Sequence, residues 1–464
     1  MEDNKRLESD SVGSLEVDKN AYYGVQTLRA KNNFNITGNL LNKKFIENLA
    51  KLKKASAIVN NRAGVLNEKI KVAIIKACDE IIEGKLHNEF IVDSIQGGAG
   101  TSMNMNANEV ICNRAIELLG GEKGDYTICH PNDHVNEAQS TNDVIPSAGK
   151  LTCIDLINEL LPSIQNLINS LNKKGEEFFD VVKMGRTQLQ DAVPMRMGEE
   201  FFAYANALKR DITRIEKARE EMYSLNMGGT AIGNSINATK EYVENIADEI
   251  AKITGYPIKQ CENLFDGTSN LDGFLSLSCA LKICATNLSK MSNDLRLLSS
   301  GPKTGISEIV LPAKQNGSSI MPGKINPVIP EVVSQVCFMV IGNDVTINMA
   351  VEAGQLELNA FEPVIFYRLF ESLTSMKNAI DTLITNCIDG IKANSDRCKN
   401  LVTSSAGIAT ALCPYIGYKK SADIAKECLK TGTPVKDLVL KYGLLDKNKV
   451  DEILDITKMT ELDK

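Results

Sequence analysis

The sequence has very little histidine, with only His87, His130 and His134 among its 464 residues. The last two stand four residues apart in His-Pro-Asn-Asp-His, a spacing that can bind a metal when it lies on a helix. Pro131 and Asn132 lie between them and disfavour a helix, so we expect no zinc site there. Neither a metal nor any other cofactor is predicted for this chain.

Long basic runs and long apolar runs are missing as well. The formal net charge is -7 at pH 7, and no stretch is basic enough to follow a phosphate backbone, which argues against a nucleic-acid partner. Residues 1–20 lack the apolar core of a secretory signal, and we expect no apolar run of membrane-spanning length. The sequence therefore predicts a soluble cytoplasmic protein that does not bind membranes.

Cysteine is present twelve times, but not as a disulfide framework. The cysteines stand singly in apolar helical surroundings, as small buried hydrophobic residues do. Examples are Cys78, Cys112, Cys153, Cys279, Cys284 and Cys337. We therefore predict free thiols.

Most of the chain has a hydrophobic period near 3.6. In residues 156–171 the apolar positions recur at steps of three and four, which predicts one helix that Pro162 either kinks or begins. Similar patterns predict long helices at 200–222, 275–298, 328–353 and 363–391. Alternating apolar and polar runs are scarce, so we expect an all-α fold built around a bundle of long helices.

The expected organisation has three parts. An N-terminal domain covers residues 1–140, a central helical-bundle domain covers 141–396, and a small C-terminal helical domain with a turn at Cys413-Pro414 covers 397–464. Residues 328–350 are apolar on more than one helical face, which is typical of a helix buried in a large core or in a subunit interface. We therefore expect an oligomer.

Four stretches combine small hydroxyl or amide residues with helix ends, and three of them also contain glycine. They are residues 97–106 (GGAGTSMNMN), 139–143 (QSTND), 185–194 (GRTQLQDAVP) and 317–327 (GSSIMPGKINP). Each alone is ordinary capping chemistry, but together their neutral donors suit a small anionic ligand. Since nucleotide-binding loops and carboxylate clusters are missing, a cofactor-free reaction on a small acid is the hypothesis that remains.

The stretch GSSIMPGKINP resembles the GSSxMPxKxNP signature of the aspartase/fumarase superfamily. The resemblance extends over nearly the whole chain and includes the other three stretches. Residues 326–344 and 352–365 are more similar to aspartate ammonia-lyases than to class II fumarases. The resemblance implies a three-domain aspartase/fumarase-like fold and a homotetramer in which each active site takes its loops from three subunits.

The implied reaction is the reversible deamination of L-aspartate to fumarate and ammonia by anti β-elimination through an aci-carboxylate. Ser318 would be the catalytic base, its pKa lowered by loop amides and by Lys324. Hydroxyl groups would stabilise the developing charge, Lys324 and Asn326 would bind the α-carboxylate, and three further residues would bind the amino group. The hydroxyl residues are Thr101, Ser140, Thr141 and Ser319, and the amino-group residues are Asn142, Thr187 and Gln188.

Gln188 departs from the many superfamily members that have histidine in this position. Because ammonia leaves from an ammonium group without needing an acid, a neutral amide is sufficient, and the glutamine favours ammonia over water as the leaving group. A class II fumarate hydratase of the same fold is the nearest alternative. A non-catalytic amino-acid-binding or structural relative is the other.

Overall fold

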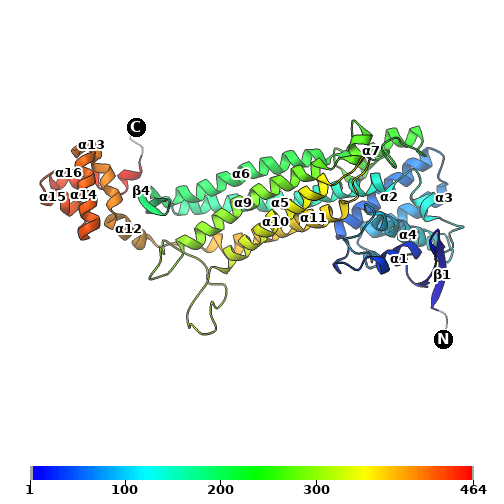
Figure 1. The fold of residues 1–464 in the computed structure, drawn as a ribbon, viewed down its shortest axis with the longest axis horizontal. Coiled ribbons are helices and arrows are strands. Elements are labelled where there is room, and N and C mark those ends of the chain that lie inside the picture. Colours follow the sequence, from blue (N-terminus) through cyan, green and yellow to red (C-terminus); the bar gives the residue numbers. More distant parts are fainter. Residues whose placement is uncertain (1–3, 462–464) are drawn as a thin grey trace. The chain divides into compact units, whose positions relative to one another are not determined.

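Helices are the main elements of the chain (Figure 1). The computed structural model describes residues 4–461, and within them the only sheets are four pairs of short strands. The prediction of an all-α fold with long helices is confirmed.

The residues group into two compact units. The first contains the residues up to Leu160, Thr213–Ile283 and Met339–Ser375, and the second contains Leu161–Ile212, Cys284–Phe338 and the residues from Met376 on. The three-domain division at residues 140 and 396 stays a prediction.

Five helices have 25 or more residues within the described chain. They are α5 (Thr141–Glu177), α6 (Met197–Met222), α9 (Asp272–Leu298), α10 (Val328–Glu352) and α11 (Glu362–Asn386). Each overlaps a helix predicted from periodicity, but α5 is far longer than predicted and does not begin at Pro162. An interior proline costs about 3 kcal/mol. Here fully buried neighbours such as Leu160 and Ile164 offset it, since both have no exposed surface.

The remaining elements of the first unit are shorter. Polar residues begin several of its helices: the Asn42 side chain caps α2 and the Thr239 side chain caps α7. The elements are β1 (Lys5–Asp10), β2 (Gly13–Asp18), α1 (Val25–Asn33), α2 (Lys43–Arg62), α3 (Glu68–Ile82), η1 (His87–Glu89), α4 (Thr101–Leu118), η2 (Pro131–Val135), β5 (Ser224–Leu225), α7 (Lys240–Thr254), β6 (Lys259–Gln260) and α8 (Leu264–Ser269).

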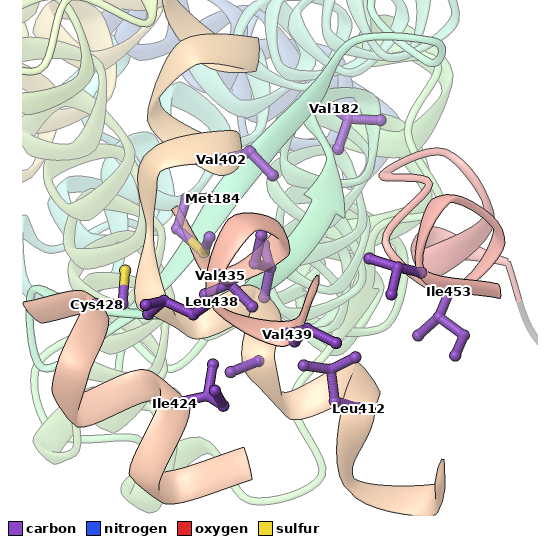
Figure 2. Packing of buried hydrophobic residues seen from close by; sticks show 13 residues of the cluster. Val182, Met184, Val402, Leu412, Ile424, Cys428, Val435, Leu438, Val439 and Ile453 are labelled. Atoms are coloured by element: carbon purple, nitrogen blue, oxygen red, sulfur yellow. The ribbon is translucent and has the colours of Figure 1, made fainter. Parts of the chain in front are cut away.

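The second unit joins a β-hairpin to the C-terminal helices. Val182 and Met184 of the hairpin pack against Val402, Leu412 and Leu438 in one buried cluster (Figure 2). The predicted turn at Cys413-Pro414 is the start of a single helical turn. The elements are β3 (Val182–Thr187), β4 (Gln190–Arg196), β7 (Ile309–Val310), η3 (Ile388–Gly390), β8 (Lys392–Ala393), α12 (Ser395–Ser404), η4 (Ala406–Leu412), α13 (Cys413–Ile416), α14 (Tyr418–Thr431), α15 (Val435–Lys441), α16 (Lys447–Ile453) and η5 (Lys458–Thr460).

Helix α10 corrects one expectation. By length and composition it could cross a membrane, so the expectation that no apolar run reaches that length is wrong. The apolar core helix of a soluble protein passes the same test, because both avoid charge over several turns. One such helix among the described residues is weak evidence for a membrane span.

The first residue of α11, Glu362, has a carboxyl group that is fully buried in the first unit. Neither oxygen has a hydrogen-bond partner within the described chain, and burial raises the pKa well above its ordinary value of 4.5, although Lys150 opposes the rise. Between pH 4.5 and the raised pKa, the folded chain keeps the carboxyl proton and the unfolded chain releases it. The free energy of unfolding should therefore fall as pH rises through 4.5, by about 1.4 kcal/mol per unit of raised pKa.

Glu362→Gln should remove this contribution and raise the melting temperature at pH 8 more than at pH 5. Thermal unfolding followed by circular dichroism at both pH values measures the effect. Glu352→Gln is the matched control, because Glu352 is exposed. Equal shifts at the two pH values would mean that Glu362 ionises normally in the folded protein.

Candidate functional site

Thr101 is the first residue of α4 and follows a glycine-rich loop. Gly98, Ala99 and Gly100 all have positive φ, at 88°, 54° and 82°. A Cβ atom on Gly100 would lie 2.8 Å from Ile145 Cγ2, so the loop can approach α5 this closely only with glycine there. The Thr101 hydroxyl donates to the Gly98 carbonyl at 2.7 Å, and the N-cap residue Gly100 has no side chain to cap the helix. Gln96 Oε1 accepts one N–H of the first turn, that of Met103, at 3.1 Å. The helix dipole still makes the start of α4 suited to an anion.

Ser140, Thr141 and Asn142 form the start of α5. The Ser140 hydroxyl accepts the backbone N–H of Asn142 at 3.2 Å, and the Ser140 N–H donates to Asp143 Oδ1 at 2.9 Å. On the neighbouring helix α4, Asn104 Nδ2 donates to the Thr141 hydroxyl at 3.4 Å. The first unit therefore brings two of the four predicted stretches together at adjacent helix starts.

The orientation of the Asn142 amide is fixed by its partner. Its Nδ2 donates to the carbonyl oxygen of Ala231 at 2.7 Å, and a carbonyl oxygen can only accept. The side-chain oxygen of Asn142 is thus left as an acceptor for a ligand.

A segment that the sequence analysis missed, residues 226–231 (NMGGTA), supports this helix start. Asp143 Oδ2 accepts the N–H groups of Gly228 and Thr230 at 3.2 and 3.0 Å, and Asn226 Nδ2 donates to the Asn142 carbonyl at 3.0 Å. The segment combines glycine with hydroxyl and amide residues, which is the pattern used to find the other four. Its composition could have revealed it.

Behind the start of α5 lies Lys53, a lysine with no exposed surface. Its Nζ donates to Asn136 Oδ1 at 2.8 Å and to Gln139 Oε1 at 3.0 Å. Burial lowers the pKa of Lys53 to about 7, and burial also raises the pKa of Asp143 to about 7. Lys53 lies on the buried face of α2. A lysine among the apolar positions of a helix was the feature of the sequence that could have revealed it.

Thr187 and Gln188 lie at the tip of the hairpin formed by β3 and β4 in the second unit. Gln188 and Leu189 have φ of 54° and 63°, as in a type I′ turn, although neither is glycine. Both side chains are exposed. The buried Glu308 holds the hairpin strand through an ion pair with Arg186 at 2.9 Å. Strained backbone positions that are held by the surrounding structure cluster at ligand-binding sites. The hairpin tip is therefore suited to contact a ligand or a partner.

The stretch that matches the superfamily signature lies in a loop, residues 311–327, between β7 and α10 of the second unit. In Figure 1 the segment between α9 and α10 is a long loop that extends outward from the ends of these helices. The Gly317 N–H donates to the Lys324 carbonyl at 2.8 Å, and Asn326 Nδ2 donates to the Gly317 carbonyl at 2.8 Å. A Cβ atom on Gly317 would lie 2.5 Å from that Lys324 oxygen, so this closure of the loop base requires glycine.

Ser318 lies inside this closed loop. Its hydroxyl oxygen accepts the N–H groups of Ile320 at 3.2 Å and Met321 at 3.0 Å. Ser318 is half-buried, whereas Ser319 and Lys324 are exposed. Two amide donors directed at one hydroxyl oxygen favour its ionised form.

The predicted site residues thus form three groups. Thr101 and residues 140–142 lie together in the first unit, whereas the hairpin pair Thr187 and Gln188 and the loop of residues 317–326 belong to the second unit. Their polar groups are hydroxyls, amides and one exposed lysine. Such groups can bind a small carboxylic acid and stabilise negative charge that develops on it.

The histidine segment differs from the expectation. Residues Pro131–Val135 form a short π-helical turn instead of an irregular loop. His130 Nδ1 accepts the N–H groups of Asn132 and Asp133 and so caps the turn, and Pro131 stands where a helix needs no N–H donor. No group of three or more His, Cys, Asp or Glu residues within residues 4–461 is placed to hold a metal ion.

Two family models match the chain. One, described as lyase, matches residues 13–342, and the other, described as fumarase C C-terminus, matches residues 408–461. Among curated proteins, the chain is 50% identical to an aspartate ammonia-lyase of a Bacillus species, over 99% of this chain and 98% of that protein. It is 51% identical to an aspartate ammonia-lyase of Helicobacter pylori, over 97% and 96%.

Solved structures are similar over the same length. A fumarate lyase:delta crystallin from Brucella melitensis, bound to cobalt, has a TM-score of 0.96 and 47% identity and covers 99% of this chain and 100% of its own. A class II fumarase from Schistosoma mansoni has a TM-score of 0.94 at 36% identity, with coverage of 98% and 99%.

Proposed function

Because the chain belongs to the lyase family identified by these comparisons, we propose that it catalyses the reversible deamination of L-aspartate to fumarate and ammonia. One observation carries the proposal: near 50% identity to aspartate ammonia-lyases along almost the whole chain, with the GSSIMPGKINP stretch intact. The enzyme is a carbon-nitrogen lyase.

Ser318 is the base that removes the proton from the carbon beside the β-carboxylate. A free hydroxyl is far too weak a base at neutral pH, so its ionised form needs stabilisation. The amides of Ile320 and Met321 supply it, together with the charge of Lys324 in the same loop. Proton removal places a second negative charge on the β-carboxylate, and hydroxyl donors stabilise this aci-carboxylate. The donors are Thr101, Ser140, Thr141 and Ser319.

The other end of the substrate is held by charge and by amides. Lys324 and Asn326 bind the α-carboxylate, and Asn326 keeps one N–H for this purpose because the other is bound to Gly317. Asn142, Thr187 and Gln188 surround the ammonium group. The Asn142 oxygen, left free by the bond to Ala231, accepts from that ammonium.

The active enzyme is a homotetramer, with each site built from three subunits. Helix α10 supports this assembly because Phe338, Val345 and Met349 are 60%, 58% and 66% exposed at steps of seven and four residues. Gly342 lies on the same face, and a Cβ atom there would meet nothing within 4 Å. An apolar stripe with a glycine is suited to a second copy of the helix.

Phe338→Glu should therefore yield smaller species without lyase activity, because a charge in an apolar helix interface is not compensated. Size-exclusion chromatography with light scattering, followed by assays of each peak, measures the result. Phe265→Glu is the control, since Phe265 is an exposed phenylalanine on a different helix, α8. An active monomer would contradict the shared-site proposal.

We place the enzyme in the cytoplasm. Within the described residues none of the twelve cysteines forms a disulfide, and nine of them are buried. Thiols in such number suit a reducing compartment.

The deciding experiment supplies purified enzyme with L-aspartate and, separately, with L-malate, and follows the absorbance of fumarate. Fumarate from aspartate alone is the expected result, since Gln188 replaces the histidine of many superfamily members. Fumarate from malate alone would identify a class II fumarate hydratase. If neither substrate yields fumarate while aspartate still binds, the chain is a non-catalytic relative.

A further inference from the structure

Two cysteines and a histidine meet at a place that the proposed catalysis does not use. Cys112 lies on α4, Cys129 precedes η2, and His134 lies on η2, all within the first unit. Both cysteines are fully buried. From the sequence, the cysteines are expected to be buried packing residues, and no metal site is expected at His134.

The contacts among them are direct. Cys112 Sγ donates its one proton to the Cys129 carbonyl at 3.0 Å, which places the two cysteines next to each other. His134 interacts with the Cys129 thiol. Because His134 Nδ1 accepts the N–H of His130 at 2.8 Å, its neutral ring carries the proton on Nε2, which is left to donate.

These contacts distinguish Cys129 from the other buried cysteines. The neighbouring Cys112 thiol and then His134 lower the pKa of Cys129 to about 6, whereas burial raises the pKa of Cys78 and Cys153. The thiolate is the nucleophilic form of cysteine. Of these two neighbouring thiols, Cys129 is therefore the one that ionises more readily.

We propose that Cys129 is a site of oxidation by hydroperoxides and that Cys112 resolves the product as a disulfide. The Cys129 thiolate attacks one peroxide oxygen, the O–O bond breaks, and sulfenic acid and hydroxide form. Cys112 then attacks the sulfenic sulfur, the S–O bond breaks, and its thiol proton leaves with the hydroxyl as water. The peroxide is reduced by two electrons and the two thiols are oxidised.

A cavity lies beside the segment that carries Cys129. Tyr126 and His130 line a solvent-open cavity of about 510 Å³, and His130 is the neighbour of Cys129 in the chain. The bond would tie α4, which begins at Thr101, to the segment that leads to Ser140. The proposal does not depend on the lyase assignment.

The test uses the intact reduced protein and hydrogen peroxide. After exposure, free thiols are blocked with N-ethylmaleimide under denaturing conditions, and unreduced peptides are identified by mass spectrometry. We expect a cross-linked peptide pair containing Cys112 and Cys129, lighter by two hydrogens and separated by dithiothreitol. Both cysteines labelled by maleimide, while other cysteines are oxidised, would overturn the proposal.

Variants separate the roles of the three residues. Cys112→Ser should leave a Cys129 sulfenic acid that dimedone traps, and Cys129→Ser should leave Cys112 reduced. His134→Gln should slow disulfide formation about tenfold, because glutamine cannot carry the positive charge by which His134 favours the Cys129 thiolate. Cys153→Ser is the control and should not change the rate. An equal rate in His134→Gln and the native protein would remove His134 from the proposal, and a disulfide in Cys129→Ser that still includes Cys112 would overturn it.

Discussion

Ser318→Ala is expected to lower kcat at least about a thousandfold, because loss of a base removes the proton-transfer step itself. Fumarate release from saturating L-aspartate measures the change, and light scattering should give the same oligomer as the native protein. The substitution also removes the acceptor for the N–H groups of Ile320 and Met321. A second variant must therefore distinguish a loss of activity caused by a changed loop conformation from one caused by loss of the base.

Ser318→Asn makes that separation. Its side-chain oxygen can still accept from amides two and three residues on, but an amide cannot act as the base. We expect it to be as inactive as the alanine variant. Activity restored by asparagine would show that Ser318 only shapes the loop, and the base would have to be sought elsewhere.

Lys324→Met should lower kcat/KM about a hundredfold or more, mainly through a higher KM. Removing one partner of a charged pair costs roughly 2–5 kcal/mol, since the substrate carboxylate loses its counter-charge. Methionine keeps most of the length of the side chain, so the loss mainly reports on the charge. Steady-state kinetics over a wide range of aspartate concentrations measures both constants.

Lys314→Met is the matched control, because Lys314 is an exposed lysine of the same loop. It should change kcat/KM only slightly. Similar losses in both variants would indicate general electrostatic attraction of the substrate by the loop, instead of a specific contact with Lys324.

The hydrophobic periodicity predicted where the long helices lie. Their ends depend on helix capping and on tertiary burial, which periodicity does not report. Helix α5 begins at Thr141 because Ser140 and Asp143 cap it, well before the strongest apolar pattern. The same helix runs through Pro162 because buried leucine and isoleucine residues offset the lost hydrogen bond. Tertiary burial decided both points.

The candidate site was predictable where glycine and hydroxyl residues stand in one short stretch. Residues 317–327 are such a case, because Gly317 closes the loop and Ser318 receives its amides. Lys53 was not found, since a lysine is ordinarily solvated even where it falls on the apolar face of a helix. Residues 226–231 were missed as well. They contact the start of α5 only in the folded chain, because Gly228 and Asp143 lie far apart in the sequence.

The way the chain is divided has a consequence for its gene. Each compact unit is assembled from three separate stretches, and all five of the longest helices contribute residues to both. A premature stop codon before Met376 therefore deletes part of both units at once. Neither unit can be obtained from one contiguous piece of coding sequence, so fragments should fold only when they are expressed together.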